Sequence, residues 1–177
     1  MRPIVKAFLK ITFTLFLSQL IIPVAMAEGD KDLGRFNSWQ AHSYKESGQT
    51  ICNMWSRPKT HAEDGKPRGD IFVYVTHRPK EKRFHEISLD MGYPLKPKSD
   101  VVLKIGSKRF KLFVKGQSAF GRSEDDKKIV KSMRAGNSMT ITGVSSKGTK
   151  TKDSYSLKGF SKANNAANKA CGTKKPK

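Results

Sequence analysis

Acidic residues and cysteines are scarce in this sequence, and both shortages narrow what the protein can do. Only 15 Asp and Glu residues stand against 35 Lys and Arg residues, which gives a formal charge of +20 at neutral pH. So large a positive excess attracts polyanions. After residue 27 the chain also lacks any apolar run near the roughly 20 residues that a membrane-spanning helix needs. We therefore expect no transmembrane segment in that part of the chain.

The first 27 residues have the pattern of a secretory signal peptide. An apolar run covers 11–24, and Ala25-Met26-Ala27 supplies a small-x-small cleavage pattern. Three basic residues precede the run: Arg2, Lys6 and Lys10. A membrane anchor is the alternative, but this run is about 14 residues long and is interrupted by polar residues and a proline, whereas spanning needs roughly 20. We predict that 1–27 is removed and that the mature chain begins near Glu28.

Export limits the partners that the positive charge can meet. The leader carries three basic residues and no acid, so 28–177 keeps 32 basic and 15 acidic residues, a formal charge of +17. The expected partners are anionic glycans of host-cell surfaces, anionic envelope lipids or lipopolysaccharide, and nucleic acid is not expected as a physiological partner. A purely solubilising role for the lysines is the alternative. The predicted location is the periplasm, the outer membrane or the medium.

The two cysteines, Cys52 and Cys171, both follow the leader. An even count in an oxidising compartment favours a disulfide, and we predict a Cys52–Cys171 bridge. Two free thiols are the alternative. A bridge over so long a loop is worth up to about 5 kcal/mol in the chain-entropy treatment. The four histidines show no ligand spacing around either cysteine, so we predict no metal site and no cofactor.

Short apolar stretches bounded by glycine, proline or charged residues predict antiparallel strands. The strands predicted in this way cover 50–55, 70–77, 84–91, 139–144 and 154–158. We interpret 61–69 as a surface loop and 145–153 as a turn-rich connection between strands.

The clearest hairpin runs from Val101 to Lys115, with Gly106-Ser107 as a two-residue type II′ loop. That loop sets the register, because each strand then pairs outward from the turn. On one face Leu103 lies opposite Phe110 and Val101 opposite Leu112; on the other, Lys104 lies opposite Arg109 and Val102 opposite Lys111. One face should be apolar and the other strongly basic.

Helical patterns are confined to two short stretches, 124–135 and 162–170. Ser123 is the expected N-cap of the first helix, and Gly136 suits its C-terminal exit. We therefore predict a mainly β fold, an antiparallel β-sandwich with one or two short accessory helices. The expected organisation is a flexible segment at 28–35, one β domain at 36–171 and a disordered basic tail at 172–177.

No residue pattern points to catalysis, and we predict that the protein is not an enzyme. The chain has neither a G-x-S-x-G elbow nor a phosphate-binding glycine loop. His85, Glu86 and Asp90 lie close in sequence. On a strand, however, His85 faces away from the two carboxylates, so the three side chains do not converge.

The basic face of the hairpin is the candidate binding site. Lys104 and Arg109 lie opposite each other, and such like-charge pairs slightly destabilise a sheet unless an anion binds. The predicted anion-binding residues are Lys104, Lys108, Arg109, Lys111 and Lys115. The alternative is that exposed lysines only deter edge-to-edge aggregation. A second positive region, 147–177, holds nine lysines and one acid, and it could tether the protein to anionic lipid.

Several short motifs follow one another along the chain. An F-x-x-W motif at Phe36 and Trp39 precedes the first cysteine, which lies in TICNMW, and MGYP follows at 91–94. The most specific block, 131–163, contains M-x-x-G, then S-x-x-G-T, then D-x-Y-S-L-x-G-F, and the second cysteine follows. In this order and spacing, the motifs resemble the family of exported bacterial proteins named for the invasion-associated locus B.

The resemblance implies an envelope or surface protein of alphaproteobacteria, linked in blood-borne pathogens to entry into red cells and without established catalytic residues. Many relatives belong to free-living or plant-associated bacteria. We therefore expect an exported, non-catalytic protein that promotes contact with erythrocytes or other host cells, or their invasion, through its basic surface. The alternative is a periplasmic housekeeping or chaperone-like factor that binds envelope components.

Overall fold

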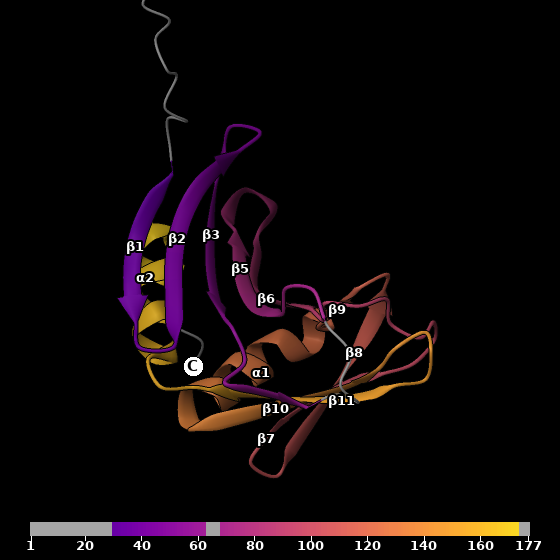
Figure 1. Ribbon diagram of the computed structural model, residues 1–177. Helices are drawn as coiled ribbons and strands as arrows, with labels where there is room; N and C mark the ends of the chain where they lie inside the picture. The colour runs from indigo at the N-terminus through magenta and orange to yellow at the C-terminus, as the bar shows by residue number, and fades with distance from the viewer. Residues whose placement is uncertain (1–29, 63–67, 174–177) are drawn as a thin grey trace, which may run out of the picture.

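The computed structural model describes residues 30–62 and 68–173, and the fold is mainly antiparallel sheet with two short α-helices (Figure 1). The predicted signal peptide lies outside the described residues. The strands are β1 (Lys31–Phe36), β2 (Trp39–Glu46), β3 (Gln49–Ser56), β4 (Thr60–Ala62), β5 (Phe72–Arg78), β6 (Arg83–Asp90), β7 (Val101–Ile105), β8 (Lys108–Lys115), β9 (Ser118–Phe120), β10 (Ser138–Val144) and β11 (Lys150–Ser156). The helices are α1 (Ser123–Ala135) and α2 (Phe160–Ala170), and η1 (Pro79–Glu81) is a single 3₁₀ turn.

One continuous sheet folds over to form the two layers of the molecule. Its strand order is β1-β2-β3-β5-β6-β9-β8-β7-β10-β11-β4. β8 belongs to both layers, because 108–112 pairs with β7 and 113–115 pairs with β9. We call β1, β2, β3, β5, β6 and β9 the first half of the sheet, and β7, β10, β11 and β4 the second half. The predicted sandwich-like, mainly β fold is confirmed.

Alternation of buried and exposed residues shows which face of each strand points inward. In β10, for example, Met139 and Ile141 are buried while Thr140 and Thr142 are half-buried on the other face. The core contains aliphatic residues from both halves together with Trp39, whose side chain is fully buried. The Trp39 indole Nε1–H donates a hydrogen bond to the Ser156 carbonyl at 3.0 Å, which satisfies its polar atom.

α2 covers the inner face of β1, β2 and β3. Its first residue, Phe160, packs edge-to-face on Trp39 with ring centroids 4.8 Å apart. Gly159 precedes it with φ +94°, and a Cβ there would lie 1.8 Å from the Phe36 carbonyl oxygen, so only glycine fits. Just beyond the helix, Cys171 forms the predicted disulfide with Cys52 of β3, with an S–S distance of 2.07 Å.

α1 is attached to β6 by a buried carboxylate. The Ile87 backbone N–H donates a hydrogen bond to Asp126 Oδ1 at 3.2 Å. A Cβ on Gly121 would lie 2.2 Å from the same oxygen, so glycine leaves the space that the carboxylate occupies. Burial raises the pKa of the Asp126 carboxyl to about 7, although the hydrogen bond from Ile87 opposes this rise. The expected Ser123 cap is wrong: Arg122 is the N-cap, and no side chain caps the helix.

A buried ion pair joins β11 to two distant connections. Arg68 donates hydrogen bonds to both Asp153 carboxylate oxygens, at 2.6 and 2.9 Å, and the two side chains are 4% and 0% exposed. Arg68 also donates to the Met91 carbonyl and lies over the Tyr93 ring, 4.8 Å from its centroid. The Tyr93 hydroxyl in turn lies 2.5 Å from that of Thr151 in β11. The pair therefore fixes Asp153 inside the fold.

The first strand corrects the prediction of a flexible segment at 28–35 over residues 31–35, whereas 28 and 29 lie outside the described residues. β1 pairs with β2, with a register shift between Asp32 and Gly34. Its sequence lacks apolar alternation because it is an edge strand, and only Leu33 and Phe36 pack against the core. Neither its polarity nor its glycine is therefore a sign of disorder here.

Other boundaries of strands, helices and the C-terminal tail also differ from the predicted ones. β4 lies at the edge of the predicted surface loop at 61–69, and β11 begins at Lys150, inside the predicted turn at 145–153. α2 begins two residues earlier than predicted, at Phe160. Thr173, in the predicted disordered tail at 172–177, donates its backbone N–H to the Asn168 carbonyl at 2.8 Å. The rest of that tail, 174–177, lies outside the described residues.

The disulfide should contribute a large share of stability. Because it closes a loop with a sequence separation of 119, replacing both cysteines by alanine should lower the free energy of unfolding by up to about 5 kcal/mol. Urea unfolding of the oxidised protein, the dithiothreitol-reduced protein and the double variant measures this. The reduced protein and the variant should agree, and the variant should not respond to reductant. Equal stability of the oxidised protein and the variant would contradict the prediction.

Asp126 should make stability depend on pH. Its folded pKa of about 7 lies above the usual 3.8, so the folded state holds the proton more tightly than the unfolded chain. The wild-type protein should therefore lose stability as pH rises from about 4 to about 7, relative to Asp126→Asn, which carries no charge there. Urea unfolding across this range compares the two proteins. A stability difference that does not change with pH would show that folding does not raise the pKa of Asp126.

Candidate functional site

The β7–β8 hairpin has the predicted register, with Lys104 opposite Arg109 and Val102 opposite Lys111. Gly106 has φ +57°, as the first central position of a type II′ turn requires. Val101, Leu103 and Leu112 are buried, whereas Lys104, Arg109 and Lys111 are exposed. The predicted separation into an apolar face and a basic face is therefore confirmed.

Two of the five candidate anion-binding residues lie apart from the other three. Lys108 is opposite Ile105, so by strand alternation it belongs to the inner side and is exposed only because it lies at the end of the hairpin. Lys115 is opposite Ser118, on the part of β8 that pairs with β9. It lies roughly 20 Å along the strand from Arg109. The structure therefore does not bring Lys115 to the basic face of the hairpin.

The basic surface continues across two further strands. Thr140 of β10 pairs with Lys104 of β7, and Thr142 of β10 pairs with Lys152 of β11. Lys150 pairs with Val144 one position further along the same alternation. We call this surface, on the outside of the second half of the sheet, the basic sheet face. Its cations are Lys104, Arg109, Lys111, Lys150 and Lys152, and all five are exposed.

The basic sheet face keeps its charge because the strands that form it carry only one acid, Asp153. Asp153 points inward to Arg68. Asp100, which precedes β7, pairs with Lys111 at 2.8 Å, but both side chains are exposed and such pairs are weak. Hydroxyl groups occupy the space between the cations, from Thr140, Thr142 and Ser154.

The sequence prediction missed Lys150 and Lys152 because it treated 145–153 as a turn. The strand alternation is present there, since Thr151, Asp153 and Tyr155 are buried while their neighbours face outward. Two of those three inward residues are not apolar, however, so hydrophobic alternation did not reveal the strand.

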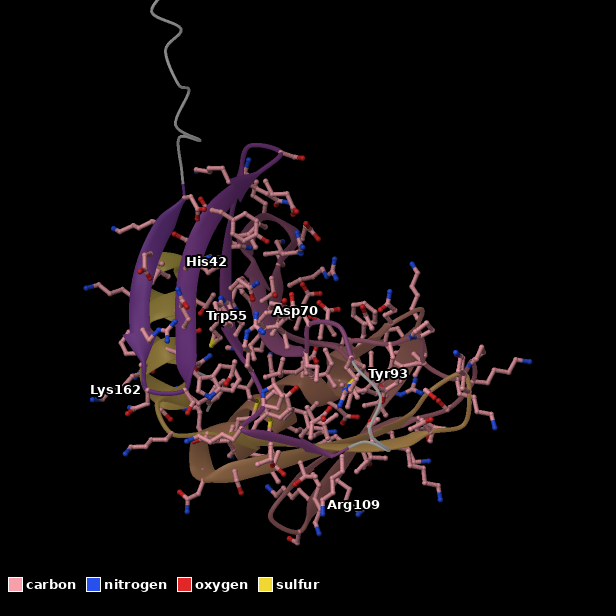
Figure 2. The ribbon with its side chains drawn as sticks, viewed as in Figure 1. His42, Trp55, Asp70, Tyr93, Arg109 and Lys162 are labelled. Carbon is pink, nitrogen blue, oxygen red and sulfur yellow. A yellow bond between two sulfur atoms is a disulfide. The ribbon has the colours of Figure 1, made fainter. Side chains whose placement is uncertain are left out.

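The second positive region, 147–177, divides between different parts of the fold. Lys150 and Lys152 join the basic sheet face, whereas Lys162 and Lys169 are exposed on α2, which covers the first half. Figure 2 shows Arg109 and Lys162 far apart on the molecule. The described lysines of this region therefore do not form one continuous surface, and Lys174, Lys175 and Lys177 lie outside the described residues.

His85 does not converge with Glu86 and Asp90, the two carboxylates that lie near it in the sequence. His85 is buried, as the predicted alternation requires, and its backbone N–H donates to Nδ1 of buried His77 at 3.0 Å. Burial lowers the pKa of His77 to about 3 and that of His85 to about 4, so both rings are neutral near pH 7. Glu86 lies on the other face of β6, where it pairs with Arg78 and Arg83.

Candidate metal sites and membrane-spanning helices are both absent from the described residues, 30–62 and 68–173. No group of three or more His, Cys, Asp or Glu side chains there could hold a metal ion. No helix in the same ranges is both long and apolar enough to cross a membrane.

Comparisons with known proteins agree with this fold. A solved structure described as the crystal structure of invasion associated protein B from Bartonella henselae is similar, with a TM-score of 0.55. The match covers 77% of this chain and 95% of that one at 14% sequence identity, so it shows a shared fold. No curated protein matches the sequence. The family described as "Invasion associated locus B (IalB) protein" matches 39–168, which is more than half of the sequence, and the chain belongs to that family.

Proposed function

We propose that this protein is an exported, non-catalytic envelope or surface protein that promotes contact with host cells, including erythrocytes, or their invasion. In this proposal the basic sheet face binds anionic glycans of the host surface or anionic envelope lipids. Membership of the family supports a role related to invasion. The observation that carries the binding part is the gathering of five exposed cations on one sheet face whose strands turn their only acid inward.

The spacing of these cations suits an extended polyanion. Lys111 and Lys152 lie on the same row, three strands apart, because Val102 and Thr142 pair between them. Adjacent strands are about 4.8 Å apart, so the row spans roughly 14 Å. A sulfated or carboxylated chain lying across the strands would meet cations at both ends, with Val102 and the Thr142 hydroxyl between them.

Electrostatics of the hairpin favour a bound anion. Lys104 and Arg109 lie directly opposite each other with both side chains exposed, and like charges in this position destabilise strand pairing. A sulfate, carboxylate or phosphate group between them would remove that repulsion. The Arg109 guanidinium could in addition donate two parallel hydrogen bonds to such a group.

Charge reversal of Lys104, Arg109 and Lys111 to Glu should abolish binding to heparin, used as a soluble polyanion. All three side chains are exposed, so the melting temperature should change little. Because binding releases counterions, wild-type affinity should also fall steeply with added salt. Isothermal titration at several salt concentrations measures both effects.

A matched variant separates the position of the charges from their number. Lys131, Lys158 and Lys162 are exposed on or beside the helices, and replacing them by Glu changes the net charge equally. This control should keep most of its heparin affinity. Equal losses in both triple variants would mean that only net charge matters, and undiminished binding by the first variant would place the site elsewhere.

Binding to intact red cells tests the host-contact part. The oxidised mature protein, residues 28–177, should bind saturably at physiological salt. Soluble heparin should displace the protein from the cells, because heparin and the cell-surface glycans compete for the same cations. The first triple variant should not bind. Flow cytometry with labelled protein measures this. Absence of binding by the wild-type protein would favour the periplasmic factor that binds envelope components.

A further inference from the structure

A row of aromatic residues crosses the outer face of the first half of the sheet. Trp55 of β3 pairs with Tyr74 of β5, and Tyr74 pairs with Ser88 of β6. Ser88 pairs with Phe120 of β9, and Phe120 pairs with Phe113 of β8. Five neighbouring strands therefore place four aromatic rings and one serine in a line. This face carries no residue of the basic sheet face.

The serine creates a gap between the rings. Tyr74 and Phe120 lie on either side of Ser88, two strand spacings or roughly 10 Å apart. Phe113 and Phe120 stack, with centroids 5.5 Å apart and planes inclined at 28°. Phe113 is 43% exposed, the most exposed large apolar side chain among the described residues. Phe113 and Phe120 thus present an aromatic surface to solvent beside the small side chain of Ser88.

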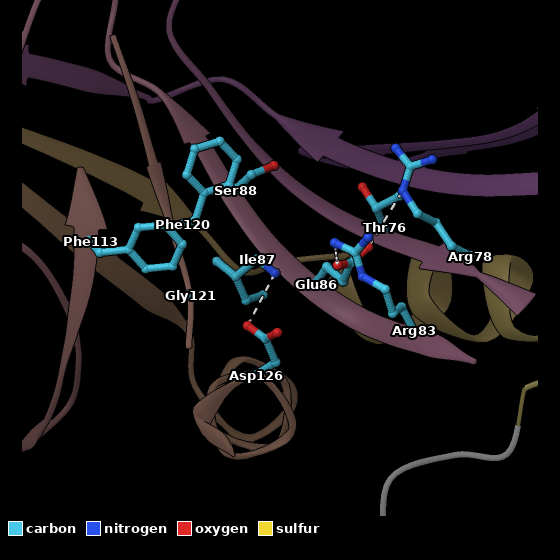
Figure 3. A pocket seen from close by; sticks show the side chains of 10 residues that line it. All are labelled: Thr76, Arg78, Arg83, Glu86, Ile87, Ser88, Phe113, Phe120, Gly121 and Asp126. Carbon is cyan, nitrogen blue, oxygen red and sulfur yellow. Dashed lines mark hydrogen bonds and ion pairs between the residues drawn. The ribbon is translucent and has the colours of Figure 1, made fainter. Parts of the chain in front are cut away.

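A cleft of about 200 Å³ opens beside this aromatic pair (Figure 3). Phe113, Phe120 and Gly121 line it on one side, Ser88 lies beside Phe120, Ile87 lies near the middle, and Asp126 lies below. At the other side are polar residues of β5 and β6: Thr76, Arg78, Arg83 and Glu86. Its volume is below the roughly 300–1,000 Å³ of sites for drug-sized ligands, so it suits a single ring.

The cleft combines hydrogen-bond donors and acceptors. The Arg78 and Arg83 guanidinium groups supply donors, and both ion-pair with Glu86, which is an acceptor. The Ser88 hydroxyl can donate and accept, and it makes no hydrogen bond to another described residue. Asp126 is a further acceptor at the bottom, where a hydrogen bond from the Ile87 N–H holds it in place.

This combination matches the chemistry of a neutral sugar. The charged groups of the cleft are already paired: Arg78 with Glu46 and Glu86, and Arg83 with Glu81 and Glu86. A bound anion or cation would therefore have to compete with an existing ion pair. Each hydroxyl of a sugar ring both donates and accepts a hydrogen bond, so it can use the two kinds of group together. The apolar C–H face of the ring can pack on an exposed aromatic side chain, as Phe113 provides.

We propose that this cleft binds a neutral pyranose ring, with Phe113 as the stacking platform and Ser88, Arg83 and Glu86 as hydrogen-bonding partners of its hydroxyl groups. Further units of an oligosaccharide would lie along the aromatic row toward Tyr74 and Trp55. The site is separate from the basic sheet face and does not depend on the polyanion binding proposed above.

Nuclear magnetic resonance titration of the ¹⁵N-labelled mature protein tests the site. The probes are four neutral oligosaccharides at millimolar concentration: cellotetraose, chitotetraose, mannotetraose and lacto-N-tetraose. At least one should shift the amide signals of Ser88, Phe113 and Phe120 saturably, and added salt should not weaken it. No saturable shift of these signals with any of the four would overturn the proposal.

Two variants of Phe113 separate stacking from general apolar contact. Phe113→Ala and Phe113→Leu should each weaken binding by up to about tenfold, since both remove the aromatic face and an aromatic contact is worth at most about that factor. Phe113 is exposed, so neither variant should unfold the protein. Tyr44→Ala, an aromatic truncation elsewhere on this half of the sheet, is the control. Full affinity of Phe113→Leu would contradict a stacking site.

The preferred oligosaccharide indicates the source of the sugar, and the charge-reversal variant tests whether the cleft and the basic sheet face bind independently. Preference for chitotetraose would indicate a glycan of the bacterial cell wall, and preference for lacto-N-tetraose a glycan of a host surface. The Lys104, Arg109 and Lys111 charge-reversal variant should bind the sugar like the wild-type protein. Loss of sugar binding in that variant would show that the cleft is not an independent site.

Discussion

The buried pair between Arg68 and Asp153 sets the orientation of β11, and the charge of the basic sheet face depends on it. Successive residues of a strand face opposite sides, so a shift by one residue would reverse every side chain. Asp153 would then lie among the outer cations, and Lys152 would point into the core. A buried pair is weak evidence of net stability, but an unpaired buried charge costs about 3–5 kcal/mol. A one-residue shift of β11 would leave Arg68 buried without its carboxylate partner, and the free-energy cost of that state disfavours the shifted strand.

β8 divides the surface into two chemically different faces. Its first residues pair with β7 and carry the cations of the basic sheet face, while its last residues pair with β9 and carry Phe113. A single strand therefore supplies Arg109 to the basic sheet face and Phe113 to the aromatic cleft. Because these faces belong to different halves of the sheet, a ligand on one does not cover the other.

The sequence predicted what local rules determine. The hairpin register followed from Gly106-Ser107 and the alternation around it, and the disulfide followed from a count of two cysteines. β1 and β11 were missed or shortened because polar strands paired to neighbours show no hydrophobic alternation. The aromatic cleft could not be predicted, since its walls come from strands that are separated in the chain. Arg68 and Asp153 lie 85 positions apart, and no local pattern connects them.

The packing of α2 on β1, β2 and β3 has a consequence for biosynthesis. The first strands to be made bury Trp39, Ala41 and Met54 against the last helix to be made. Until that helix is synthesised, the inner face of these strands has no cover and Cys52 has no partner. The chain therefore completes its fold only when nearly all of it is available, so a product truncated before α2 would expose an apolar surface and a free thiol to chaperones and proteases.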